Sequence, residues 1–141
     1  MDQFLAFAAK NWLLFAAFFA ILATLITTEI LRLMRGVRSI DPQQAVRLLN
    51  DDEATMVDVR DPAEFRAGHI TDARNLPLKE FDRRVSELDR YRERTVIVCC
   101  QSGARSQSVA TKLKKAGFAK VANLSGGMQS WTSANLPVVR K

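Results

Sequence analysis

The chain has 141 residues, with 21 Lys and Arg against 15 Asp and Glu and a formal net charge of +6. The charges are interspersed and form no basic stripe interleaved with aromatic residues, so nucleic acid is not an expected partner. One histidine and two adjacent cysteines supply neither a metal-ligand set of the usual spacing nor an ordinary disulfide pair. We therefore expect no metal and no cofactor.

The first expected element is an apolar helix near the N-terminus. Residues 11–28 are eighteen uncharged residues rich in Phe, Leu, Ile and Ala, and a helix of that length spans about 27 Å, close to the hydrocarbon core of a bilayer. Trp12 lies at one end of the run, where an interfacial aromatic residue is expected. The run has neither the polar face of a soluble core helix nor the basic start and A-x-A-like site of a signal peptide. We expect one transmembrane span over about residues 11–28.

Basic residues around this span predict its orientation. Lys10 alone precedes the span, whereas three arginines follow it: Arg32, Arg35 and Arg38. Because cytoplasmic flanks carry the excess of basic residues, we expect a single-pass protein of the cell (inner) membrane with a cytoplasmic C-terminal domain. Residues 1–35 would form the membrane anchor with a basic juxtamembrane segment, and residues 39–141 one small domain.

Residues 39–141 alternate helix and strand signals. Short apolar strands are predicted at residues 55–59, 95–99 and 121–124, with a short extended piece near Leu76. Helices are predicted after Asp41-Pro42, after Asp61-Pro62, from Phe81 to Leu88, from Ser106 to Ala116, and after Gly126-Gly127. This alternation is typical of an α/β domain with a central, mostly parallel sheet flanked by helices. Binding sites in such sheets lie at the carboxyl ends of the strands.

The segment from Cys99 to Ser106 joins the strand at residues 95–99 to the following helix and is the strongest candidate site. A cysteine at such a junction meets inward-turned backbone N–H groups and the positive end of the helix. Both favour the thiolate, which is the nucleophilic form of cysteine. From these residues alone, Cys99 and Cys100 are both candidate nucleophiles.

Three separated stretches form a recognisable set. The first runs from Val57-Asp58-Val59-Arg60 to Leu76-Pro77, the second is Cys100–Ser106, and the third is Leu124-Ser125-Gly126-Gly127-Met128 with Trp131. Together they resemble the single-domain rhodaneses, a family of sulfurtransferases. The second is similar to the family's active-site loop. Order and spacing match over about residues 39–138, with Asp72 as a departure where the family usually has glycine. The apolar N-terminal helix lies outside the resemblance.

The resemblance implies a rhodanese-like domain and a mechanism of sulfur transfer. The implied catalytic residue is Cys100, whose thiolate attacks a sulfane sulfur, for example in thiosulfate, and becomes a persulfide. The implied substrate-binding and persulfide-stabilising loop is Gln101, Ser102, Gly103, Ala104, Arg105 and Ser106. The implied partners are a small sulfur donor and a thiol acceptor. The predicted anchor indicates that the protein also contacts the membrane, and it suggests a membrane protein partner.

Two side chains of this loop have alternative roles. Arg105 would orient an anionic donor, or it would form a salt bridge to a carboxylate such as Asp58 or Glu64. Ser106 would donate its hydroxyl to the sulfur, or it would cap the helix. Within Gly68-His69-Ile70, His69 is expected to fix a turn.

Two other functions compete with sulfur transfer. Cys99 and Arg105 fit the C-x5-R spacing of tyrosine-type phosphatases, but Val98 stands where that family usually has histidine, and Cys99 continues an apolar strand. Many rhodanese-like domains serve as non-catalytic binding or regulatory modules at a fixed location. Modules that have lost catalysis often lack the cysteine, whereas Cys100 and its full loop are present here.

Overall fold

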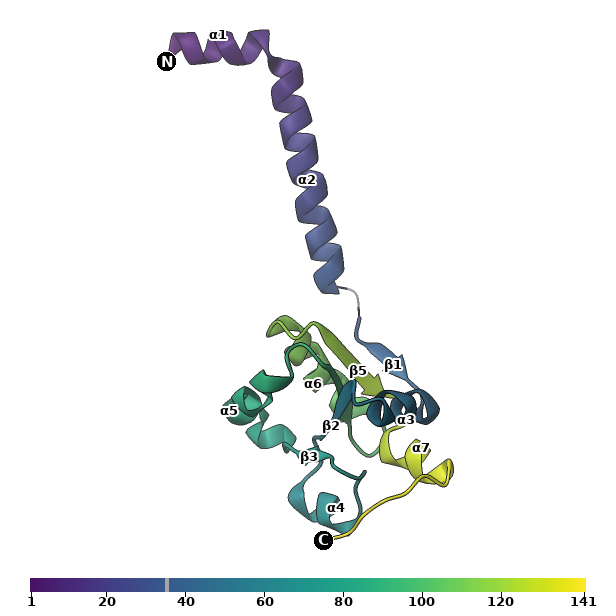
Figure 1. Ribbon diagram of the computed structural model, residues 1–141. Coiled ribbons are helices and arrows are strands. Elements are labelled where there is room, and N and C mark those ends of the chain that lie inside the picture. The colour runs from purple at the N-terminus through teal and green to yellow at the C-terminus, as the bar shows by residue number, and fades with distance from the viewer. Residues whose placement is uncertain (35) are drawn as a thin grey trace. The chain divides into compact units, whose positions relative to one another are not determined.

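The computed structural model describes residues 1–34 and 36–141 (Figure 1). The chain divides into two compact units, Met1–Arg35 and Gly36–Lys141. The first unit holds two helices, α1 (Asp2–Lys10) and α2 (Trp12–Met34). They meet at Asn11, whose side-chain amide donates to the Phe7 carbonyl over 2.8 Å and so satisfies an acceptor at the end of α1.

Helix α2 contains the predicted apolar run except for Asn11 and extends beyond it to Met34. Its stretch Trp12–Leu31 has 20 residues, a mean hydropathy of 2.1 and no buried portion, so by length and composition it is able to cross a membrane. Of the basic residues expected to follow the span, Arg35 lies outside the described residues, and so does the side chain of Arg32.

The second unit is built on a five-stranded parallel sheet of order β1-β5-β4-β2-β3. The strands are β1 (Arg38–Ile40), β2 (Ala54–Asp58), β3 (Arg74–Asn75), β4 (Thr95–Cys99) and β5 (Lys120–Leu124). The helices are α3 (Pro42–Asn50), α4 (Pro62–Ala67), α5 (Phe81–Arg84), α6 (Ala104–Lys115) and α7 (Gly127–Ser133), with 3-10 segments at Leu78–Glu80 and Val85–Tyr91. The predicted α/β class and parallel sheet are confirmed.

Two helix starts follow directly from the sequence. Asp41 accepts the Gln44 N–H at 2.8 Å, and Gln44 reaches back to the Asp41 N–H, which together form a capping box before α3. At α4, the Glu64 carboxylate accepts the Asp61 N–H at 3.1 Å. Each helix has proline at its first position, where no N–H is needed.

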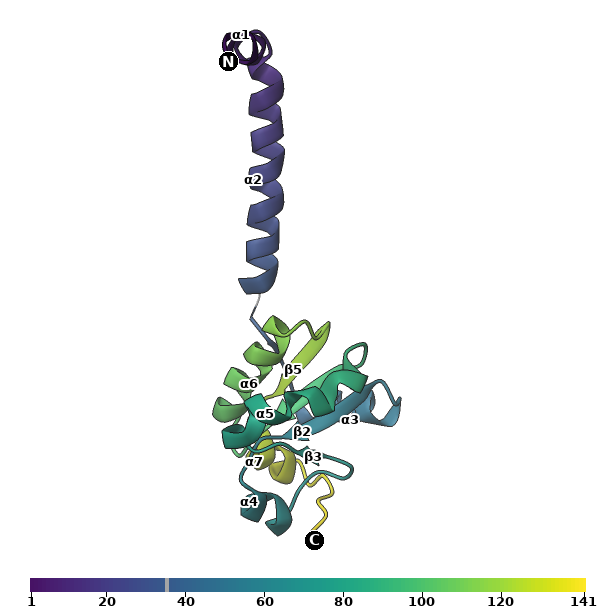
Figure 2. The same ribbon diagram turned by 90° about the vertical axis from the view of Figure 1, so that its left-hand side faces the viewer.

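Alternation along β4 divides the core into two layers. Helices α5 and α6 cover one face of the sheet, and α3 and α7 cover the other (Figures 1 and 2). Val96 and Val98 pack with residues of α5 and α6, whereas Ile97 and Cys99 pack with residues of α3 and α7. Cys100, one residue further, falls in the layer of Val96 and Val98. The two adjacent cysteines therefore lie on opposite sides of the sheet.

One strand was not predicted, and two helix predictions need correction. The sheet begins with β1 at Arg38, a strand that the charged segment after the span did not suggest. The region from Phe81 to Leu88 is a short α-helix followed by 3-10 turns rather than one helix. The helix after the cysteines begins at Ala104, two residues before the predicted start, because Gly103 takes a left-handed φ of 97° at its N-cap.

Candidate active site

The candidate loop begins where β4 ends at the carboxyl edge of the sheet. Cys100 follows the last strand residue and has no exposed surface. Gln101 and Ser102 are exposed, Gly103 is buried, and the first turn of α6 supplies Ala104, Arg105 and Ser106. The six predicted loop residues therefore lead from the cysteine into the first turn of a twelve-residue helix.

The Cys100 sulfur is the focus of several hydrogen-bond donors. The Gly103 N–H donates to Sγ at 3.1 Å, the Ser106 N–H at 3.4 Å, and the Ser106 hydroxyl lies 3.4 Å away. Burial would raise the pKa of the Cys100 thiol, but hydrogen bonds from the Ser106 hydroxyl and from the Ser106, Ser102 and Gly103 amides together outweigh it and lower that pKa. The geometry therefore favours the thiolate over the thiol at Cys100.

Helix α7 anchors the outer side of the same loop. The Met128 N–H donates to the Cys100 carbonyl at 2.8 Å, and the Gln129 N–H donates to the Gln101 carbonyl at 3.1 Å. A trans peptide directs its C=O and N–H in opposite directions, so fixing the Gln101 carbonyl on α7 turns the next amide, that of Ser102, toward the sulfur. A Cβ at Gly127 would lie 2.2 Å from the Cys100 carbonyl oxygen, which explains the glycine.

A buried asparagine that we did not predict holds the hydroxyl beside the sulfur. Asn123, on β5, donates to the Gly103 carbonyl at 3.2 Å, and its Oδ1 lies 2.5 Å from the Ser106 hydroxyl. The Ser106 hydroxyl also lies 3.1 Å from the Gly103 carbonyl, so its single proton has three acceptors within reach. Ser106 is the third residue of α6, not its N-cap, so the capping alternative is wrong.

The arginines near the loop are each paired with a carboxylate. Arg105 makes two hydrogen bonds to Glu64 at 3.1 Å, so of the two predicted carboxylate partners the structure selects Glu64. Arg60 is buried against Asp58, with a shortest contact of 2.7 Å, and also donates to the Gly68 carbonyl. These two ion pairs join the loop, the end of β2 and α4.

Cys99 lies in a different environment from Cys100. It is completely buried beneath α3 and α7, and burial, with a further contribution from the charge of Asp58, raises its pKa well above the usual range. A thiol held neutral in an apolar layer is a poor nucleophile. The geometry thus disfavours the phosphatase register that starts at Cys99.

The single histidine lies outside the loop. His69 Nδ1 lies 2.8 Å from the Phe65 carbonyl, the ring stacks on Phe65, and the backbone bridges to Val139. These contacts fit the predicted turn-fixing role. Among residues 1–34 and 36–141, no group of three His, Cys, Asp or Glu side chains is placed to hold a metal ion.

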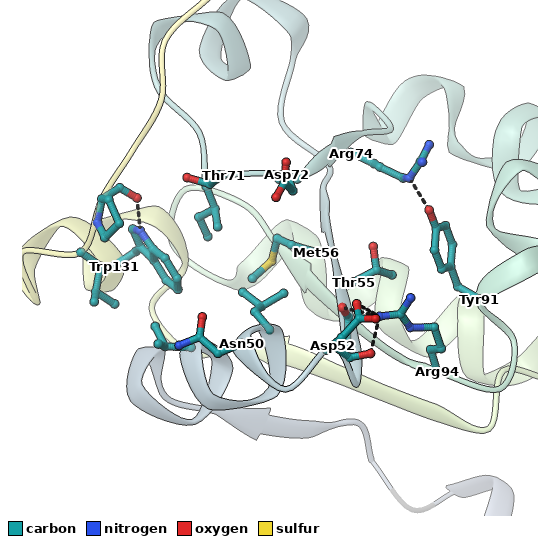
Figure 3. A pocket seen from close by; sticks show the side chains of 17 residues that line it. Asn50, Asp52, Thr55, Met56, Thr71, Asp72, Arg74, Tyr91, Arg94 and Trp131 are labelled. Atoms are coloured by element: carbon teal, nitrogen blue, oxygen red, sulfur yellow. Dashed lines mark hydrogen bonds and ion pairs between the residues drawn. The ribbon is translucent and has the colours of Figure 1, made fainter.

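A separate pocket of about 790 Å³ lies beside α3, β2 and α7 (Figure 3). Met56 and Trp131 line it, and Arg94 at its rim is paired with Asp52. No residue of the loop from 100 to 106 lines this pocket. It is therefore distinct from the sulfur-centred site.

Comparisons with known proteins agree with this fold. Residues 41–134 match the family model of the rhodanese-like domain, and the chain belongs to that family. YibN of Escherichia coli (strain K12) is 36% identical over 141 residues, covering 99% of both chains. A protein named sulfurtransferase from Allochromatium vinosum is 38% identical over 104 residues, covering 73% of this chain and 95% of the relative.

A solved structure shows the same architecture. The crystal structure of a rhodanese-related protein from Thermoplasma volcanium superposes with a TM-score of 0.68 at 30% identity, covering 74% of this chain and 99% of that one. The predicted resemblance to single-domain rhodaneses is thereby confirmed.

Proposed function

We propose that this protein is a membrane-anchored sulfurtransferase that carries sulfur as a persulfide on Cys100. The Cys100 thiolate attacks the sulfane sulfur of a donor such as thiosulfate. The new S–S bond forms as the donor's S–S bond breaks, and sulfite leaves with the electron pair. An acceptor thiolate then attacks the outer sulfur, and Cys100 departs as the thiolate.

The observation that carries this proposal is the convergence of donors on the Cys100 sulfur. The Gly103 and Ser106 amides and the Ser106 hydroxyl lie within 3.4 Å of Sγ. Both resting thiolate and persulfide are anions, so a set of fixed donors stabilises each stage of the cycle. In this proposal Gln101, Ser102, Gly103, Ala104, Arg105 and Ser106 form the substrate-binding loop. Because Cys100 has no exposed surface, a donor reaches it only after neighbouring side chains move.

We further infer that residues 1–35 anchor a domain over residues 39–141 to the inner membrane, with that domain in the cytoplasm. The apolar stretch Trp12–Leu31 supports a span, and the match to YibN covers 99% of the chain and so includes this stretch. A reporter fused to the C-terminus tests the orientation. A cytoplasmic signal is expected, and a periplasmic signal would contradict the inferred topology.

Steady-state assays test the chemistry. The full-length protein in detergent is expected to form thiocyanate from thiosulfate and cyanide, Cys100→Ser to form none, and Cys99→Ser to retain activity. Hydrolysis of p-nitrophenyl phosphate that depends on Cys99 would instead indicate a phosphatase. An intact fold without turnover in either assay would indicate a binding module.

A further inference from the structure

The mouth of the Cys100 loop has little positive charge to offer a donor. Gln101, Ser102 and Ala104, its exposed positions, are uncharged. Arg60 is only 4% exposed and is occupied by Asp58 and the Gly68 carbonyl. Arg105 is thus the arginine of the loop that is exposed enough to meet an incoming anion.

The carboxylate of Glu64 is paired with the guanidinium of Arg105. The two side chains share two parallel hydrogen bonds of 3.1 Å. The side chain of Glu64 is 38% exposed and that of Arg105 is 37% exposed, so the pair lies at the surface of the site. Glu64 is held in place, because the same carboxylate accepts the Asp61 N–H at the start of α4. The hydrogen bond from Arg105 is the largest cause lowering the pKa of Glu64, which keeps this carboxylate ionised at neutral pH.

Other negative charge surrounds the same guanidinium. Its pKa is raised chiefly by the hydrogen bond to Glu64 and further by the charges of Cys100 and Asp61. The charges of Arg60 and Asp58 cancel, and so do those of Arg105 and Glu64. The Cys100 thiolate therefore makes the net charge of the site negative. A doubly charged donor entering this site meets stronger repulsion than a singly charged one.

We propose that Glu64 is a specificity-determining residue that withholds Arg105 from the donor and so disfavours dianionic donors relative to monoanionic ones. This inference rests on the proposed sulfur transfer through Cys100. Thiosulfate and methanethiosulfonate are suitable probes, because both present a sulfane sulfur but carry two charges and one charge, respectively. Their leaving groups are sulfite and methanesulfinate.

The decisive variant is Glu64→Gln in the full-length protein. Glutamine at this position still accepts the Asp61 N–H, so the start of α4 is kept. Released from its carboxylate, Arg105 should bind the thiosulfate dianion and lower its KM by about threefold to tenfold, with kcat little changed. The KM for methanethiosulfonate should change less, and the difference should shrink at high salt.

Two further variants control for indirect effects. Glu87→Gln makes the same change in net charge at a different ion pair, that with Arg84, and should leave both KM values unchanged. In an Arg105→Gln background, Glu64→Gln should no longer change the preference between donors. Thermal unfolding of each variant verifies the fold.

The outcomes separate this inference from the proposed function. If wild type forms the persulfide but Glu64→Gln leaves the ratio of the two kcat/KM values unchanged, the role of Glu64 is wrong and sulfur transfer stands. The role of Glu64 is also wrong if Glu87→Gln, or Glu64→Gln in the Arg105→Gln background, shifts this ratio by the same factor as Glu64→Gln alone. If neither donor loads Cys100 in wild type, the proposed function itself fails.

Discussion

Replacing Ser106 with alanine should raise the pKa of Cys100, because it removes one donor and leaves the backbone amides in place. The hydroxyl lies 3.4 Å from Sγ, and a hydrogen bond to a charged group contributes about 1.5–3 kcal/mol. The same proton is drawn to Asn123 Oδ1 at 2.5 Å, so the lower end of this range applies. One pKa unit corresponds to about 1.36 kcal/mol, and the expected rise is therefore about one unit.

The titration is measured by thiolate absorbance in the far ultraviolet, which does not depend on reagent access to the buried sulfur. Cys99 stays protonated over the relevant range, because burial raises its pKa. Ser108→Ala is the matched control, since that hydroxyl lies on the same helix but donates to the Arg105 carbonyl. An unchanged or lower Cys100 pKa in Ser106→Ala would refute the assignment of this hydroxyl as a donor to the sulfur.

Three further predictions concern the same site. Asp58→Asn should leave the buried Arg60 charge unpaired and lower the free energy of unfolding by about 3–5 kcal/mol, measured by denaturant titration; a loss below about 1 kcal/mol would contradict it. Gly127→Ala should push α7 from the loop, lower Tm and raise the Cys100 pKa, whereas Gly36→Ala, with no atom within 4 Å of its Cβ, should change neither; equal effects would argue against the α7 anchor. Because the Cys100 pKa is lowered, the rate of persulfide formation should rise with pH to a plateau, with a midpoint below the pKa of an ordinary cysteine. A midpoint at the pKa of an ordinary cysteine would count against stabilisation of the thiolate by the loop donors.

The framework of the domain was predictable because its signals are local. The β-branched run of β4 and the Asp-Pro starts of α3 and α4 each specify an element through nearby residues. Alternation along β4 also predicts which cysteine faces the loop, because the adjacent residues Cys99 and Cys100 lie on opposite sides of the sheet. These features gave the sheet and the location of Cys100.

The remaining site features depend on contacts between distant segments. Asn123 stands 17 residues from Ser106, and no local pattern links an asparagine in an apolar strand to that hydroxyl. The sequence placed Gly127 only before a predicted helix and within a family-like stretch, and its close approach to the Cys100 carbonyl follows from the packing of α7. Likewise, the choice of Glu64 over Asp58 as the partner of Arg105 is decided by the pairing of Asp58 with Arg60.

The most direct test of sulfur transfer through Cys100 is the intact mass of the full-length protein after incubation with thiosulfate. We predict a gain of one sulfur atom, mapped to Cys100 by peptide analysis, retained in Cys99→Ser and absent in Cys100→Ser. Subsequent addition of cyanide should remove it. Wild-type protein that gains no sulfur, or gains it on Cys99, would contradict a persulfide carried on Cys100.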